Sequence, residues 1–149
     1  MSIKPVNIIN RKAGFEYHVD LKFTAGIVLS GTEVKSIRMG NANISDAFCV
    51  IENNEVWIKN MHVSEFKQGS YNNHAPIHNR KILLNRSEIN KIIGKLKDKG
   101  TAVFPLKLYS SDRGFLKIDI GVGKGKKAFD KRDDIKQRDV QRELSRMKF

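Results

Sequence analysis

The sequence predicts a mainly β protein: a small antiparallel barrel with flanking helices, followed by a basic tail. About six or seven short apolar or alternating runs outnumber two helical patterns in roughly the first 120 residues. Short turn sequences separate consecutive runs, which favours hairpins and antiparallel pairing. The apolar runs end near Val122. We therefore expect one domain over residues 1–122 and a tail over residues 123–149.

The first strands are predicted between residues 8 and 30. Residues 1–14 read as loosely ordered, apart from a short strand at residues 8–9. From Phe15 apolar and polar side chains alternate, as in a half-buried strand. One face of this strand carries Tyr17, Val19, Leu21 and Phe23. The segment AGIVLS continues the sheet after a bend or bulge at Ala25-Gly26.

A short helix and a hairpin come next. Thr32 is predicted to cap the helix and Gly40 to stop it. Two strand-like runs, at residues 48–52 and 55–59, flank Asn53-Asn54. This pair tolerates the positive φ angles of a tight turn, so we expect a β-hairpin here.

The second half begins with a long polar segment at residues 62–79. It is interpreted as a surface loop, and loops of this length in compact domains are often functional or disordered. The segment RKILL at residues 80–84 then predicts a strand. Asn85 with Glu88 gives the capping pattern of a helix that runs to about Lys97.

A second hairpin is predicted over residues 101–122. It turns near residues 112–114, and Pro105 is expected at an edge or a bulge. Strands joined by hairpins and accompanied by few helices favour a small closed or partly open barrel. An oligonucleotide-binding-type barrel is one member of this class, and the pattern alone does not distinguish it from other small barrels.

Charge indicates a polyanionic partner. The chain has 28 Lys and Arg against 16 Asp and Glu, a net charge of +12. Ten of the basic and five of the acidic residues lie from Lys124 onward, so both the body and the tail are basic. Such an excess attracts polyanions. Nucleic acid is favoured over an anionic membrane because no segment has the large apolar face of a lipid-binding helix.

The tail combines interleaved charges with few apolar side chains. Ile135, Val140, Leu144 and Met147 give a ragged helical stripe with too little apolar area for an independent helix. This pattern is typical of a segment that is disordered alone and helical on a partner. Phe129 offers a ring for stacking on a base, while the cations meet phosphates. A plain solubilising tail fits the same composition equally well.

Other classes of function have weaker support. Cys49, the single cysteine, lies in an apolar run and is interpreted as a core residue in a reducing, cytoplasmic compartment. His74 and His78 are not accompanied by further ligand groups, so no metal or cofactor is predicted. No catalytic motif is present, and we expect no enzyme. The alternative is an enzyme acting on nucleic acid through a carboxylate or histidine in residues 62–79.

Several longer motifs occur in order along the chain. They are NRKA at 10–13, AGIVLSGTEVKSIRMGNANISD at 25–46, VWIKNMHVS at 56–64, RKILLN at 80–85 and GKGKKAFDKRDDIKQRD at 123–139. Together they resemble the SsrA-binding protein family, also called small protein B (SmpB). The resemblance runs from about Ile8 to the end of the chain.

The resemblance implies an oligonucleotide-binding-type barrel with helices at its side. Members of the family bind the tRNA-like domain of transfer-messenger RNA (tmRNA, or SsrA RNA) and enter stalled bacterial ribosomes with it for trans-translation. Their C-terminal tail becomes helical in the empty mRNA channel. The implied partners are therefore tmRNA and the ribosomal RNA of the decoding centre and mRNA channel. A monomer without cofactor, metal or membrane attachment is expected.

Two sets of RNA-binding residues are predicted. In the body, Leu83 and Lys117 align with family positions associated with tmRNA binding. Charge adds to them Arg11, Lys12, Lys35, Arg38, Arg80 and Lys81. In the tail, Asp130-Lys131-Arg132 matches the family motif implicated in accommodation on the ribosome. The full tail set is Lys124, Lys126, Lys127, Phe129, Asp130, Lys131, Arg132, Lys136 and Arg138.

Two positions depart from the family pattern. Thr24 stands where many relatives have Glu, which removes a carboxylate able to accept hydrogen bonds from RNA, and Thr24 is left out of the predicted set. Phe129 stands where some relatives have His or Tyr, and it keeps a stacking face without a hydrogen bond. A general RNA-binding barrel or ribosome-associated factor without tmRNA specificity is the alternative function.

Overall fold

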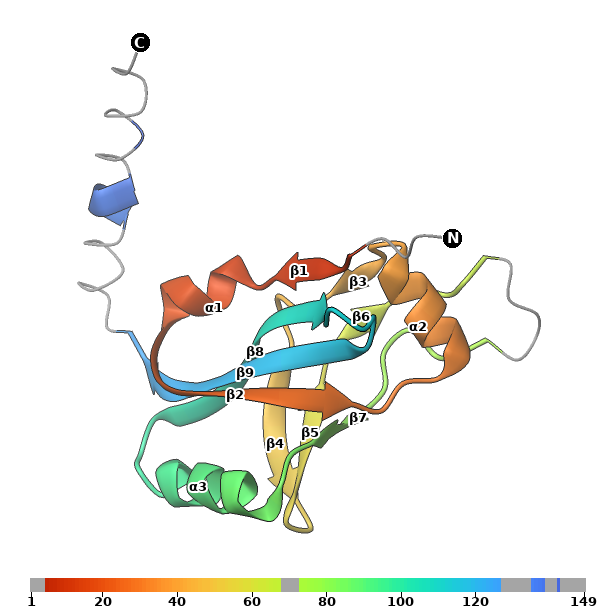
Figure 1. Cartoon of the computed structure of the whole chain (residues 1–149). Helices are drawn as coiled ribbons and strands as arrows, with labels where there is room; N and C mark the ends of the chain where they lie inside the picture. The colour runs from red at the N-terminus through yellow and green to blue at the C-terminus, as the bar shows by residue number, and fades with distance from the viewer. Residues whose placement is uncertain (1–4, 68–72, 127–134, 139–141, 143–149) are drawn as a thin grey trace.

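The computed structural model describes residues 5–67, 73–126, 135–138 and 142. It shows the mainly β fold with flanking helices that the sequence predicts (Figure 1). In the body the elements are, in chain order, β1 (Asn7–Ile9), α1 (Arg11–Glu16), β2 (Tyr17–Ile27), α2 (Gly31–Arg38), β3 (Ala42–Asn43), β4 (Phe48–Glu52), β5 (Glu55–Lys59), β6 (His62–Val63), β7 (Arg80–Leu83), α3 (Arg86–Leu96), β8 (Thr101–Ser110) and β9 (Leu116–Gly125).

The main sheet closes on itself. Strands β8, β4, β5, β7, β2 and β9 pair in this order, and β9 pairs back with β8. All of these pairings are antiparallel. β1 adds to the outer side of β8, and β3 pairs with β6 in a small second sheet. Closure removes exposed strand edges, and it confirms the predicted barrel.

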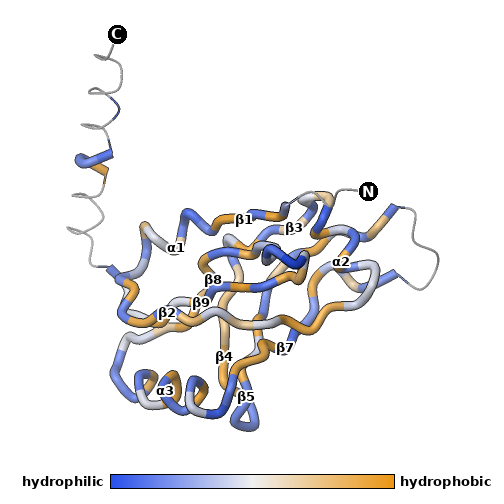
Figure 2. The backbone as a smooth tube through the Cα atoms, viewed as in Figure 1, coloured by the Kyte–Doolittle hydropathy of each residue, from blue (hydrophilic) through white to orange (hydrophobic). Residues whose placement is uncertain are grey.

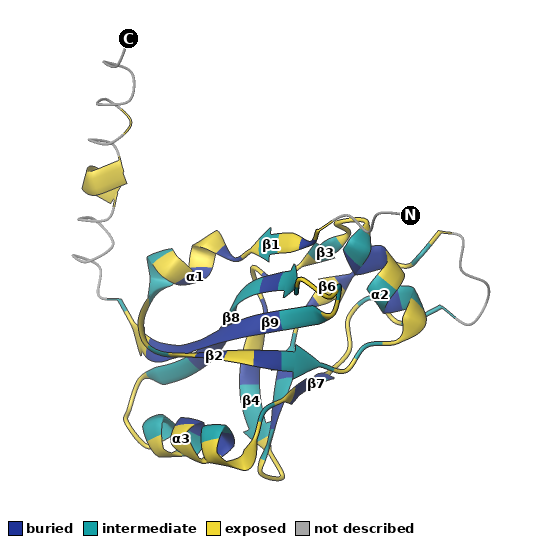
Figure 3. Ribbon diagram, viewed as in Figure 1, coloured by how far each residue is buried: buried dark blue, intermediate teal, exposed yellow. Residues whose placement is uncertain are grey.

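Apolar side chains from the strands fill the barrel. Val56 and Ile58 on β5, and Ile118 and Ile120 on β9, are fully buried. Figure 3 shows buried stretches along β9 and exposed residues on the helices and turns. Figure 2 shows hydrophobic and hydrophilic residues alternating around α3, as expected for a helix with one face on the barrel. Burial raises the pKa of the Cys49 thiol to about 12, so this side chain is a neutral core residue as predicted.

Local sequence signals place several elements correctly. Asn53 and Asn54 adopt φ angles of 53° and 60° in the β4–β5 turn. The Asn85 side chain accepts from the Glu88 amide at 2.9 Å, and the Glu88 carboxylate accepts from the Asn85 amide at 3.1 Å, which begins α3 as predicted. The register shifts between Pro105 and Lys107, which confirms a bulge next to Pro105.

Three local predictions were wrong. α2 is capped by Ser30, through a capping box with Glu33, and not by Thr32. The N-terminal segment forms β1 and α1. Asn10 caps α1, because its side chain accepts from the Ala13 amide at 3.2 Å, and it donates to the Pro105 carbonyl at 2.8 Å. The Ala25-Gly26 pair lies in regular pairing, and the irregularity of β2 falls between Val19 and Leu21 instead.

This bulge also explains how the tail leaves the barrel. A Cβ atom at Gly123 would lie 1.6 Å from the His18 carbonyl oxygen, so only glycine fits where β9 passes the bulge in β2. β9 continues through Gly125, and the Lys126 amide donates to the Glu16 carbonyl at 2.8 Å. Residues 123–125, assigned to the tail from the sequence, therefore belong to the last strand of the barrel.

Candidate nucleic-acid interface

A row of three paired residues marks one face of the barrel. Gly26 on β2 pairs with Leu83 on β7 and with Lys117 on β9. Directly paired residues of antiparallel strands share a face. Gly26 has no side chain, and a Cβ there would lie 3.3 Å from the Leu83 Cβ. The two residues that the family resemblance singles out, Leu83 and Lys117, are thus brought together from opposite sides of Gly26.

The row forms part of a surface cleft of about 350 Å³. α2 contributes Val34 and Arg38 to its lining, and the β8–β9 turn contributes Phe115. Arg38 joins these two parts, because its Nη2 donates to the Gly114 carbonyl at 2.5 Å. The cleft thus brings together three predicted residues, Leu83, Arg38 and Lys117, from segments far apart in the sequence.

Phe115 is a lining residue that the sequence reasoning missed. Its side chain follows the turn residue Gly114, which has a φ of 87°, and it is 65% exposed. A large aromatic residue at the tip of a predicted hairpin was the available signal. Such a residue has no neighbouring strand to cover it, and exposed aromatic side chains are common at binding surfaces.

Thr24 lies on the same ladder, next to a carboxylate from β9. Its Oγ1 donates to Asp119 Oδ1 at 3.0 Å, and Lys22 Nζ lies 3.5 Å from Asp119 Oδ2. Asp119 is 4% exposed. The carboxylate at this point of the barrel is therefore paired within the protein.

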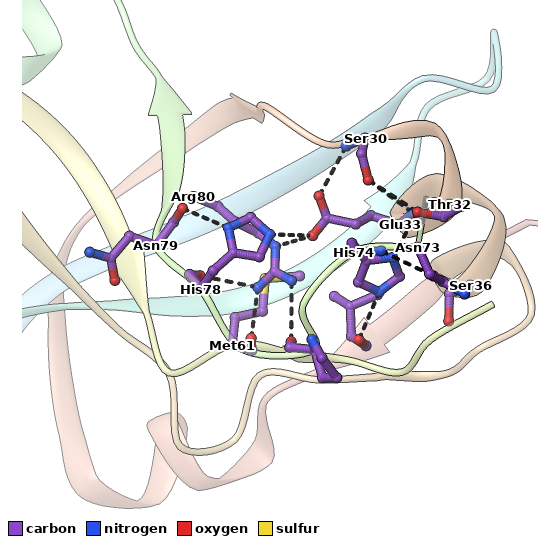
Figure 4. Close-up of polar contacts among 12 residues, drawn as sticks. Ser30, Thr32, Glu33, Ser36, Met61, Asn73, His74, His78, Asn79 and Arg80 are labelled. Atoms are coloured by element: carbon purple, nitrogen blue, oxygen red, sulfur yellow. Dashed lines mark hydrogen bonds and ion pairs between the residues drawn. The ribbon is translucent and has the colours of Figure 1, made fainter. Parts of the chain in front are cut away.

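Arg80 has a different environment from the one its charge suggested. It is 1% exposed and forms an ion pair with the buried Glu33 of α2 (Figure 4). Its Nη1 donates to the Met61 carbonyl at 2.7 Å, and its Nη2 donates to the Pro76 carbonyl at 3.2 Å. Because the guanidinium is enclosed by these acceptors, Arg80 is not part of a surface open to RNA in this structure, contrary to the prediction.

Two histidines extend this network, which holds the described parts of the 62–79 segment against α2. His78 Nε2 lies 3.0 Å from Glu33 Oε2. His74 Nδ1 lies 2.8 Å from Thr32 Oγ1, and His74 Nε2 lies 2.9 Å from the Val63 carbonyl. In the described part of the chain no three His, Cys, Asp or Glu side chains gather as a metal site would require.

The electrostatics of Glu33 reflect this pairing. Burial by itself raises the pKa of the carboxyl group, but hydrogen bonds from the Ser30 amide and from Arg80, with the charge of Arg80, outweigh it. The pKa of Glu33 is therefore lowered. The network is a charged structural unit that ties α2 to β7 and to the described parts of the 62–79 segment.

The other predicted body residues are dispersed. Arg11 and Lys12 are exposed on α1, which Figure 1 places at the end of the barrel away from α2. Lys12 Nζ lies 3.1 Å from Asp46 Oδ1, and Lys81 Nζ lies 3.0 Å from Glu55 Oε1. Lys35 is exposed on α2, with its Nζ 5.5 Å from the centre of the Phe66 ring. These residues do not line the cleft.

Four predicted tail residues are described. Lys124 lies on β9 and Lys126 directly follows it, whereas Lys136 and Arg138 are exposed residues of a helical turn at residues 135–138. The Arg138 guanidinium lies 5.4 Å from the centre of the Phe15 ring of α1. Lys127, Phe129, Asp130, Lys131 and Arg132 lie outside the described residues.

The sequence matches the SmpB protein family over residues 7–148. The chain belongs to this family. The match spans both the barrel and the tail, and it confirms the resemblance that the ordered motifs indicated. The helices in the described part of the chain are too short and polar to cross a membrane.

Named relatives agree with the family match. The SsrA-binding protein of Cytophaga hutchinsonii is 48% identical over 147 residues, which cover 99% of this chain and 96% of the relative. That of Bacillus subtilis is 50% identical over 137 residues, which cover 92% and 87%. A solved structure described as "tmRNA-SmpB: a journey to the center of the bacterial ribosome" is 38% identical, with a TM-score of 0.68, and the match covers 82% of this chain and 85% of that one.

Proposed function

We propose that this protein binds the tRNA-like domain of tmRNA and delivers it to stalled bacterial ribosomes for trans-translation. The observation that carries the proposal is the family match over residues 7–148, together with relatives named SsrA-binding protein over nearly their whole length. The role is one of binding and delivery. No bond is made or broken by the side chains of this protein.

The barrel supplies the surface for tmRNA. Leu83 and Lys117 contribute to it from β7 and β9, and Arg38 contributes from α2. Cations meet the phosphates, while exposed apolar side chains meet bases or sugars that are not covered by base pairing. Arg11, Lys12, Lys35 and Lys81 lie elsewhere on the barrel and add to its overall positive charge, which favours encounter with RNA.

The tail acts on the ribosome. The tail leaves the barrel at the end of β9, where the Lys126 amide donates a hydrogen bond to the Glu16 carbonyl. A vacant mRNA path is walled by RNA phosphate, and a cationic tail that orders there distinguishes an empty channel from an occupied one. The cost of ordering the tail lowers its affinity for each unit of contact area, which keeps the interaction reversible.

Peptide tagging on ribosomes stalled at the end of an mRNA without a stop codon tests this function. With tmRNA present, the wild-type protein is expected to support tagging, and omission of the protein is expected to abolish it. Truncation after Lys126 keeps β9 complete and should preserve tmRNA binding while tagging is lost. Full tagging by the truncated protein would contradict the role of the tail.

Phe129 allows a finer test within the tail. Phe129→Ala removes the ring, whereas Phe129→Tyr keeps it, so tagging is expected to fall much further for Phe129→Ala if the ring stacks on a base. Equal loss in both variants would argue against stacking.

A further inference from the structure

The C-terminal tail leaves the barrel directly beside the last turn of α1. Tyr17, the first residue of β2, pairs with Gly125 at the end of β9. The Lys126 amide then donates to the Glu16 carbonyl at 2.8 Å. Figure 1 shows the described helical turn at residues 135–138 on the side of the barrel where α1 lies. A chain held by one hydrogen bond at its base can still point in many directions, so the direction of the tail depends on a second contact.

The second contact joins Arg138 to Phe15. The guanidinium carbon of Arg138 lies 5.4 Å from the centre of the Phe15 ring, which is within the range of a cation–π interaction. Because Phe15 directly precedes Glu16, the tail meets α1 at two adjacent residues, first at Lys126 and again at Arg138. Two points of contact restrict the direction of a segment, whereas one does not.

α1 is a suitable platform for this contact because it is fixed to the barrel. The buried Asn10 side chain caps the helix and donates to the Ile44 and Pro105 carbonyls at 3.2 and 2.8 Å. Ala13, in the middle of α1, is buried. Phe15 is half-buried and is not one of the residues of the buried core. Its ring is therefore presented by a rigid element without being needed to fill the barrel.

Stacking on Phe15 leaves the hydrogen-bonding edge of Arg138 available. The guanidinium group is planar, so its face contacts the ring while its N–H donors point outward in the plane. A phosphate can bind this edge while Phe15 holds the face. Arg138 is one of the tail residues predicted to bind ribosomal RNA, and the contact with Phe15 therefore places a cation that the tail uses.

We propose that Phe15 is a positioning residue for the tail. It stacks against Arg138, directs the tail away from the α1 end of the barrel and leaves the N–H donors of Arg138 free to meet RNA. An exposed cation–π contact changes an equilibrium by only about two- to fivefold. Phe15 thus biases the direction of the tail without locking it, and the tail can still adjust to the ribosome. This inference rests on the proposed function, in which the tail acts on the ribosome.

The free protein gives the first test, because this test needs neither RNA nor ribosomes. Protons close to the face of an aromatic ring are shifted upfield in NMR spectra, so the side-chain protons of Arg138 should be shifted upfield in the wild type and in Phe15→Tyr. Phe15→Leu keeps an apolar side chain but removes the ring, and the shift should disappear. Phe48→Leu, which removes a 46% exposed ring from β4, is the matched control and should keep the shift. Identical Arg138 signals in wild type and Phe15→Leu would overturn the contact.

Peptide tagging on stalled ribosomes tests the consequence of the contact. With the protein limiting, Phe15→Leu should lower the tagging rate about two- to fivefold, the factor for one exposed cation–π contact. Phe15→Tyr and the control Phe48→Leu should tag like wild type, and thermal melting checks that each variant keeps the fold. Equal tagging by wild type and Phe15→Leu would overturn the positioning role.

Affinity for the tRNA-like domain separates positioning of the tail from RNA binding by the barrel. Phe15→Leu should bind this RNA as tightly as wild type, because the Phe15 ring acts on the tail. A loss of affinity that matches the loss of tagging would overturn the proposal and assign Phe15 to the RNA surface of the barrel.

A double-mutant cycle shows whether Phe15 acts through Arg138. Arg138→Gln removes the cation and should lower tagging by itself, because it also removes a contact to RNA. In this background Phe15→Leu should cause no further loss. A further loss as large as in the wild-type background would overturn the proposal, since Phe15 would then act through another residue.

The two proposals fail in different ways. If the wild-type protein with tmRNA does not support tagging on stalled ribosomes, the proposed function is wrong, and the NMR signals of Arg138 still decide whether the contact exists. If the wild type supports tagging and Phe15→Leu tags equally well, the function stands and the positioning role of Phe15 is wrong.

Discussion

Two regions on either side of α2 use arginine in opposite ways. On one side Arg80 is 1% exposed and is surrounded by Glu33 and main-chain carbonyls. On the other side Arg38 lines a surface cleft and keeps a donor without a partner among the described residues. Both arginines lie in motifs typical of the family, and both were predicted to bind RNA. The structure separates them by their surroundings, since Arg80 is enclosed by its partners, whereas Arg38 is partly exposed and lines the cleft.

The comparison therefore divides stability from binding. Substitutions in the Glu33–Arg80 network should change the free energy of unfolding, whereas substitutions in the cleft should change RNA affinity with little effect on folding.

Glu33→Gln should cause the largest loss. It leaves the Arg80 guanidinium buried without its counter-charge, and removal of one partner from such a pair costs about 3–5 kcal/mol. Chemical denaturation measures the change. Glu55→Gln, which breaks a partly exposed pair with Lys81, is the control and should cost less than about 1 kcal/mol. Similar small losses for both variants would show that the network does not support the fold.

Stability should also fall at acidic pH through Glu33. The pKa of Glu33 is lowered in the folded protein, so its contribution to stability is fully present above its ordinary pKa of 4.5. That contribution is lost as the pH falls from 4.5 through the lowered folded-state value. Denaturation curves at several pH values should show a smaller loss of this kind in Glu33→Gln than in wild type. The same pH dependence in both proteins would assign the effect to other carboxyl groups.

Lys117→Met should act on binding instead. It removes one cation from the cleft and keeps the aliphatic part of the side chain, so the free energy of unfolding should change by less than about 0.5 kcal/mol. The salt slope of binding to the tRNA-like domain should fall by about 1, the value for one phosphate contact. An unchanged slope would place the phosphate contacts elsewhere on the barrel.

Lys81→Gln should have only a small effect on stability. Lys81 lies on β7 beside the network but pairs with Glu55 at the surface, with the side chains of both residues 37% exposed. Loss of such a pair changes stability by about 0–1 kcal/mol. The same denaturation experiment measures the loss in the free energy of unfolding. A loss as large as that of Glu33→Gln would mean that an ion pair beside the network supports the fold even when it is partly exposed.

The elements predicted correctly are those specified by neighbouring residues. Asn53-Asn54 defines its turn, and Asn85 with Glu88 defines the start of α3, whatever surrounds them. α1 was missed because its cap, Asn10, is held by the Pro105 carbonyl from a distant strand. The bulge in β2 was misplaced because it depends on the close approach of Gly123 to His18.

The site was predictable only in part for the same reason. Family motifs indicated Leu83 and Lys117, and charge indicated Arg38, but no local pattern shows that all three line one cleft. The burial of Arg80 depends on Glu33, which is 47 residues away in the sequence. The charge of Arg80 does not show that its counter-ion lies so far away in the sequence. A prediction based on charge also could not select Phe115, which is uncharged.

We expect this protein to recognise tmRNA by its shape as well as by its charge. The most direct test is a binding titration of the wild-type protein with the tRNA-like domain of tmRNA and with an ordinary tRNA, repeated over several salt concentrations. Contacts to phosphate weaken with salt for both RNAs. We predict that the tRNA-like domain keeps a large advantage at physiological salt. Two curves that fall together would contradict this account and indicate a general basic RNA-binding protein.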